Sequence, residues 1–132
     1  MSARFKAAVA AIDAGDCDEL RALLEASPGL IHARAPSKGC PYDGYFRRAT
    51  LLHHCAGNPT RGGVPENIVE VARTLLECGA EVDAATEFTE AWNWTTLGLV
   101  ASSGPAAEQG FAEPMIDLLL EHDIAYIPTL SA

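Results

Sequence analysis

The chain contains 132 residues, of which 48% are hydrophobic and 20% are charged. This composition is typical of a globular protein and the length fits a single domain over residues 1–132, so a disordered chain is excluded. No apolar run approaches the roughly 18 residues that a membrane-spanning helix needs, and we therefore expect no membrane association.

The net charge of −9 is divided unevenly along the chain. Residues 1–61 contain eight Lys or Arg against six Asp or Glu, whereas residues 62–132 contain one against twelve. An acidic half of this kind repels phosphate groups, which argues against nucleic acid as a partner and favours a protein with a basic surface. The alternative is that the acidic side chains only keep the protein soluble.

The cysteines are spaced without a Cys-x-x-Cys pair, at Cys17, Cys40, Cys55 and Cys78. Most of them lie in or beside predicted helices, where a free thiol packs as a small hydrophobic group. The apolar stretch 7–12 near the N-terminus is too short for a secretory signal. Both observations predict a cytoplasmic protein.

The first predicted helical pair covers residues 3–34. Apolar residues recur at helical spacing in Phe5, Ala8, Val9 and Ile12. Gly15 is expected to end this helix in the left-handed conformation, and Asp16 is expected to cap the next one. The second helix presents Leu20, Leu23 and Leu24 on one face and is predicted to end before Pro28.

A second pair is predicted over residues 49–84. Thr50 opens a short apolar helix that ends before residues 57–59, and Pro65 is suited to the first position of the following helix. Apolar residues then continue at helical spacing to Leu76, and Gly79 is expected to end the helix.

The third pair, over residues 94–127, begins with an apolar helix near Thr95 and is expected to break at Gly104-Pro105. It resumes near Pro114 with Ile116, Leu119 and Leu120 as its buried face. Each pair alone has too narrow an apolar stripe to be stable. Stacked side by side, the three pairs bury one continuous core, which predicts an all-α solenoid.

Two segments resemble the ankyrin repeat family. Residues 50–56, TLLHHCA, are similar to its Thr-Pro-Leu-His-x-Ala signature, and residues 69–84, VEVARTLLECGAEVDA, are similar to its second helix and turn. Residues 115–124, MIDLLLEHDI, repeat the second pattern more weakly. The resemblance implies a structural role for Thr50, Leu52, His53, Ala56, Leu75, Leu76, Gly79, Leu119 and Leu120. It also implies that His53 hydrogen-bonds within its own turn and to the neighbouring unit.

The spacing of the units departs from the family. An ankyrin unit is about 33 residues long, and the units of this chain are longer. The additional residues fall between the units, at 36–48 and 86–94, and within them, at 58–64 and 102–111. We call 36–48 the first loop and 86–94 the second loop. Long loops in a compact domain are more often functional than neutral.

No catalytic or metal motif is recognisable. His53, His54 and Cys55 are adjacent, but neighbouring residues on a helix point about 100° apart and cannot converge on one ion. Neither Cys55 with His54 nor Cys40 with a distant histidine has a glycine elbow or an orienting acid. We therefore expect no metal, no cofactor and no enzymatic activity.

The two loops hold most of the chain's nine aromatic residues, and the resemblance places them on the same edge of adjacent units. Tyr, Trp and Arg dominate binding hot spots. The loop residues expected to bind a partner are Tyr42, Tyr45, Phe46, Arg47, Arg48, Phe88, Trp92 and Trp94. The alternative is that these rings fold back and cover the core.

The leading functional hypothesis is protein–protein interaction through the two loops and the adjoining concave face. A second hypothesis is a small-molecule pocket or vestigial enzyme site between the loops, lined by Tyr45, His53, Trp92 and Trp94. A third is self-association of copies of the chain, with the basic half of one against the acidic half of another.

Overall fold

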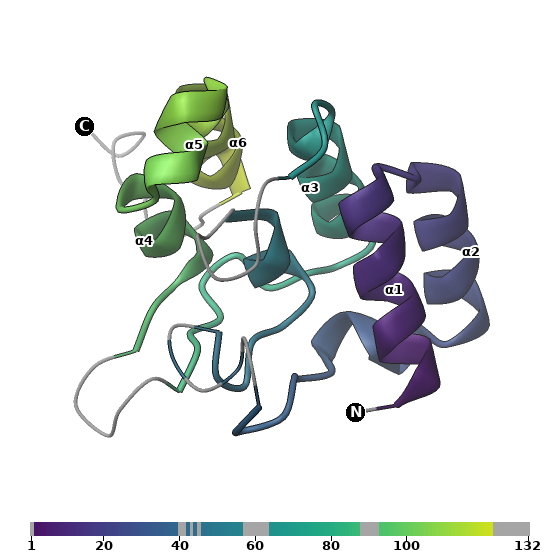
Figure 1. Ribbon diagram of the computed structural model, residues 1–132. Coiled ribbons are helices and arrows are strands. Elements are labelled where there is room, and N and C mark those ends of the chain that lie inside the picture. The colour runs from purple at the N-terminus through teal and green to yellow at the C-terminus, as the bar shows by residue number, and fades with distance from the viewer. Residues whose placement is uncertain are drawn as a thin grey trace, which may run out of the picture.

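The computed structural model describes residues 2–39, 42, 44, 46–56, 64–87 and 93–122 (Figure 1). Within these ranges the α-helices and 3₁₀ helices (η) are α1 (Ala3–Ala14), α2 (Cys17–Ala26), η1 (Pro28–His32), η2 (Leu52–Ala56), α3 (Ile68–Glu77), α4 (Thr96–Ala101), α5 (Gly104–Gln109) and α6 (Ala112–His122). An isolated antiparallel bridge joins Ala85 to Thr95. The prediction of an all-α protein is confirmed.

The junction between α1 and α2 forms as the sequence predicts. Gly15 follows α1 with a φ of 70°, and the Asp16 carboxylate accepts a 3.0 Å hydrogen bond from the N–H of Glu19 at the start of α2. Glycine is required at position 15 for two reasons. A side chain there would strain the backbone, and its Cβ would collide with the side chain of Asn67, which donates a hydrogen bond to the Gly15 carbonyl.

The second pair differs in detail from its prediction. Residues 52–56 form the 3₁₀ helix η2, and all five are buried. Helix α3 begins at Ile68, not at Pro65, because a turn closed by a 3.1 Å hydrogen bond from the Ile68 N–H to the Pro65 carbonyl precedes it. Gly79 follows the end of α3 with a φ of 102°, a left-handed conformation suited to glycine.

The third pair contains a helix, α5, that was not predicted from the sequence. Gly104-Pro105 was expected to be a break, but these residues begin α5. The Ser103 hydroxyl accepts a hydrogen bond from the Ala106 N–H, and proline is tolerated in a first helical turn because its missing N–H would have no helical partner there. A Gly-Pro pair after a capping residue thus starts a helix.

The buried face of α6 is rotated from the predicted one. Met115, Leu118 and Leu119 are buried, whereas Ile116 and Leu120 are only half-buried. The predicted stripe and the observed one have the same i, i+3, i+4 spacing and differ by one residue, or about 100° around the helix. Leucine at three consecutive positions, 118–120, makes the two stripes equivalent in sequence. The structural assignment of Leu120 is therefore corrected to Leu118.

The helices form two rows that share one core. Helix α1 contacts η2, which contacts α4, and in the second row α2 contacts α3, which contacts α6 (Figure 1). The rows pack on one another through the pairs α1–α2, η2–α3 and α4–α6. Their largest fully buried side chains include Phe5, Ile12, Leu20, Leu51, Leu52, Ile68, Leu75, Met115, Leu118 and Leu119.

Two further observations concern membranes and thiols. None of the helices in the described ranges is long and apolar enough to cross a membrane. Cys17 and Cys78 are free thiols, and Cys55 is fully buried in η2. Cys40 and residues 123–127, the end of the third predicted unit, lie outside the part of the chain that the structure describes.

Candidate functional site

The two long loops leave the helices at closed bases. At the base of the first loop, the Ala35 N–H donates to the Ala49 carbonyl at 2.8 Å. At the base of the second, the Thr86 N–H donates to the Trp94 carbonyl at 2.8 Å, and the Trp94 N–H donates back to the Thr86 hydroxyl at 3.1 Å. Each loop therefore begins and ends at one place, on the same side of the helices in Figure 1.

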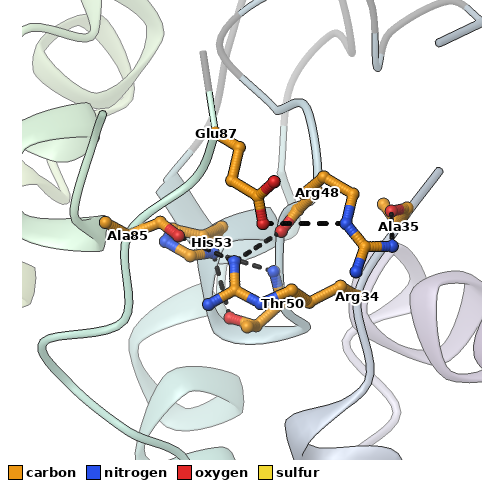
Figure 2. A network of polar contacts seen from close by, with 7 residues as sticks. All are labelled: Arg34, Ala35, Arg48, Thr50, His53, Ala85 and Glu87. Carbon is orange, nitrogen blue, oxygen red and sulfur yellow. Dashed lines mark hydrogen bonds and ion pairs between the residues drawn. The ribbon is translucent and has the colours of Figure 1, made fainter. Parts of the chain in front are cut away.

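A backbone hydrogen bond and one arginine join the two bases to each other. The Glu87 N–H donates to the Arg47 carbonyl at 2.9 Å. The Nη1 group of Arg34 donates to the Arg48 carbonyl at 2.8 Å and to the Ala85 carbonyl at 2.7 Å, so one guanidinium spans both loops (Figure 2). Hydrogen bonds from a charged donor are stronger than those between neutral groups. The loop bases thus form a single structural unit.

Arg48 adopts an unusual backbone conformation within this unit. Its φ is 57°, which is rare for a residue with a side chain, and no other non-glycine residue in the described ranges has a positive φ. Hydrogen bonds from its N–H to Pro36 and from its guanidinium to Ala35 hold it there. Its Nε also lies 3.7 Å from a carboxylate oxygen of Glu87 (Figure 2).

His53 lies beneath the loop bases and is fully buried. Its Nδ1 accepts hydrogen bonds from the N–H and the hydroxyl of Thr50, at 2.8 and 2.9 Å. Its Nε2 lies 2.8 Å from the Ala84 carbonyl, which can only accept, so the proton of the neutral ring is on Nε2. His53 therefore makes contacts within its own turn and with Ala84, at the end of its own predicted unit, in the segment that leads to the next unit.

The surroundings of His53 favour the neutral imidazole. The pKa of His53 is lowered from 6.5 to about 4, mainly by burial and also by the positive charge of Arg34, against the opposing effect of the hydrogen bonds to the Ala84 and Trp94 carbonyls. A neutral histidine with both nitrogens hydrogen-bonded inside the chain is not offered to a ligand or a metal. His53, one of the four residues expected to line a small-molecule pocket, thus has both ring nitrogens hydrogen-bonded within the chain.

His54 anchors the first loop to the core. Its Nδ1 lies 2.8 Å from the Thr50 carbonyl, so it carries the proton, and its Nε2 then accepts from the Tyr42 hydroxyl at 3.0 Å. The rings of Phe5, Tyr42 and Phe46 surround the imidazole with centroids 5.7–5.8 Å away. The neighbouring histidines are therefore opposite tautomers that bind different partners.

The partner-binding role expected of Tyr42 and Phe46 is corrected by this packing. Both side chains are buried, with exposed fractions of 7% and 0%. They turn inward, where both rings pack against the imidazole of His54. For these two rings the alternative, folding back on the core, is the one observed.

The other expected loop residues are distributed differently. Arg47 is exposed, and Arg48 is half-exposed beside Glu87. Trp94 is half-buried and packs against the core, with its ring next to Gly98 of α4. Tyr45, Phe88 and Trp92 lie outside the described residues.

Two residues of the joined loop bases were not anticipated from the sequence. Arg34 lies in an irregular polar segment and Glu87 in the second loop, and neither belongs to a motif. Arg34 contacts residues that lie 14 and 51 positions further along the chain, and no local sequence pattern reveals such contacts. An arginine shortly before a long loop is a weak signal.

The rest of the described surface has two hollows. No set of three or more His, Cys, Asp or Glu side chains in these ranges is arranged to hold a metal ion. One hollow of about 300 Å³ is lined by residues 80–83 and His122, and another of about 200 Å³ lies between Leu24, Ile31 and Cys78. Neither includes a residue of the joined loop bases.

No protein-family model matches the chain, and no curated protein matches it. Function must therefore be inferred from the geometry of the described residues.

Proposed function

We propose that the chain is a non-enzymatic, cytoplasmic protein of the ankyrin type, with three stacked units, that binds another protein. Two features support the ankyrin-type stack. Six of the described helices lie in two rows of three, and His53 joins its own turn to the segment that leads to the next unit. Both are what a solenoid of helical pairs needs.

The binding surface we propose is the pair of loops and the adjoining concave face. The observation that carries this proposal is the joining of the loop bases by the Arg47–Glu87 backbone hydrogen bond and by Arg34. A surface that is ordered before binding loses less conformational freedom when a partner docks. Loops held on a rigid helical scaffold are also the usual location of binding residues.

The charge distribution suggests the partner's overall character. Residues 62–132 contain twelve acidic residues and one arginine, so the partner surface that faces them is proposed to be basic. Self-association could satisfy the same complementarity, because residues 1–61 are slightly basic.

A site-specific crosslinking experiment tests the proposal. A photoreactive amino acid placed at Arg47, on the exposed loop base, should capture a protein of defined mass in the native host. The same group at Arg73, on α3, serves as the matched control and should not capture it. Crosslinking to the same protein from both positions, or from neither, would contradict a binding site at the loops.

A further inference from the structure

The joined loop bases concentrate positive charge in a chain whose net charge is −9. Arg34 donates a hydrogen bond to the carbonyl of Arg48, and Arg47 directly precedes Arg48 in the chain. Three of the chain's nine basic residues therefore lie at the loop bases. We call Arg34, Arg47 and Arg48 the arginine cluster. Among the described residues, one carboxylate, that of Glu87, forms an ion pair with the cluster.

Glu87 does not neutralise the cluster. Its oxygen lies 3.7 Å from Nε of Arg48, beyond hydrogen-bonding distance, and the two side chains are 56% and 41% exposed. Water and salt screen an exposed pair of this kind. Among the described residues, the three arginines of the cluster thus have one loosely placed carboxylate beside them, which leaves an excess of positive charge at the loop bases.

The cluster is held in place from within the chain. Arg34 is half-buried and fixed by two carbonyls from different loops, and Arg48 is fixed in its left-handed conformation. Bringing like charges together is unfavourable, and so is a left-handed backbone at a residue with a side chain. Local strain of this type is concentrated at functional sites. An anion bound at the cluster would relieve the charge repulsion.

The chemistry of the cluster selects the kind of anion. A guanidinium presents donors in a planar fork that matches a carboxylate or a phosphate. A long polyanion such as nucleic acid would also meet the acidic residues that dominate positions 62–132. A short run of carboxylates can reach the cluster without that repulsion.

We infer that the arginine cluster binds a short acidic segment of the protein partner, rich in Asp or Glu. This inference rests on the proposed protein-binding function and adds the chemistry of the segment that contacts the loops. It is compatible with a basic surface elsewhere on the same partner, facing residues 62–132. The partner would then carry an acidic segment that faces the arginine cluster and a basic surface that faces residues 62–132.

A fluorescence-anisotropy titration with defined peptides tests the inference. The probe is a labelled peptide with six consecutive glutamates, and its controls are the same peptide with six glutamines and a six-nucleotide oligothymidine. The glutamate peptide alone should bind, and Arg47→Glu should weaken its binding by about tenfold or more. Arg47→Lys should retain part of the affinity, because the charge remains while the fork is lost.

Arg73→Glu provides the matched control. Arg73 lies on α3, where its side chain is 42% exposed and pairs loosely with Glu70. The Arg73→Glu variant makes the same charge change away from the loops and should bind the glutamate peptide within about twofold of the unmodified chain. Circular dichroism melting shows whether each variant is folded. Arg47→Gln replaces Arg47→Glu if the latter unfolds.

Several results would overturn the inference. They are an absence of binding by the glutamate peptide, equal binding of the glutamine peptide or the oligonucleotide, and equal weakening by the Arg47 and Arg73 substitutions. A partner crosslinked from position 47 together with a glutamate peptide that does not bind would leave the proposed function standing and refute the acidic segment. Specific binding of the glutamate peptide without any crosslinked partner would support an acidic ligand at the cluster and contradict the proposed protein-binding function.

Discussion

The Nε2–H group of His53 donates a 2.8 Å hydrogen bond to the carbonyl of Ala84, 31 residues further along the chain. The other ring nitrogen accepts both donors of Thr50. Protonation of Nδ1 would place a donor against two donors, so the hydrogen-bond pattern requires a neutral ring. Both burial and hydrogen bonding thus connect the charge of His53 to the stability of the fold.

Stability should fall as the pH is lowered below about 6.5. The pKa of His53 is about 4 in the folded protein and 6.5 when unfolded, so between these values the unfolded chain binds a proton that the folded chain does not. The contribution is fully present above pH 6.5 and is lost as the pH falls towards 4, by about 3 kcal/mol in total. Urea unfolding at a series of pH values measures this loss.

A variant isolates the part due to this histidine, since carboxylates also titrate near pH 4. His53→Ala should lower the free energy of unfolding at pH 7 by about 1–3 kcal/mol, because Thr50 and Ala84 lose their buried partner. Its stability should then change less than that of the unmodified chain between pH 6.5 and 4.5. Parallel pH profiles for the two proteins would contradict the assignment of a depressed pKa to His53.

Adjacent leucines in α6 allow a direct test of the buried face. Leu119→Ala should cost about 2–5 kcal/mol of unfolding free energy, because the side chain is fully buried and its loss leaves a cavity. Leu120→Ala should cost clearly less, since Leu120 is half-exposed. Chemical unfolding of both variants measures the difference. Equal losses, or a larger loss at Leu120, would support the stripe predicted from the sequence instead.

Features of the fold that depend on a single residue were predicted from the sequence better than those that depend on other residues. Helix ends at Gly15 and Gly79 and the cap at Asp16 were predicted correctly, because each depends on the conformation or side chain of a single residue. Helix α5 was missed because a Gly-Pro pair can end one helix or begin the next. Which of these occurs depends on Ser103, whose hydroxyl caps α5.

The candidate site was less accessible to sequence reasoning. An aromatic residue looks the same in the sequence whether its side chain is exposed or buried. The sequence of the first loop therefore does not show that Tyr42 and Phe46 turn inward towards His54. Arg34 was missed for a related reason. Its contacts reach Arg48 and Ala85, and their distance in sequence hides them.

The Tyr42 hydroxyl should contribute to stability through its hydrogen bond with His54. Tyr42→Phe keeps the buried ring and leaves Nε2 of His54 without this donor, which should cost about 1–2 kcal/mol. Tyr42→Ala also removes the ring and should cost more, about 3–5 kcal/mol, as for other buried aromatic residues. Thermal melting of the two variants gives the order. A Tyr42→Phe variant as stable as the unmodified chain would show that the hydroxyl does not need this acceptor.

Arg34→Ala should affect the loops and His53 together. It removes the donor shared by the Arg48 and Ala85 carbonyls, so the loop bases should separate more readily and the Glu87 amide should exchange its hydrogen faster. It also removes a positive charge that lowers the pKa of His53, so that pKa should rise. The pKa should nevertheless remain below 6.5, because burial is the larger cause and is unchanged.

The change at Arg34 can be compared with one at Arg73, which pairs only with Glu70 across one helical turn. Arg73→Ala should lower stability by less than about 1 kcal/mol and should leave both the Glu87 exchange rate and the His53 pKa unaltered. Nuclear magnetic resonance of each variant measures amide exchange and histidine titration in the same sample. If Arg34→Ala accelerates exchange without raising the His53 pKa, the arginine acts on the loops through its hydrogen bonds alone. If neither quantity changes, Arg34 does not join the two loops in solution.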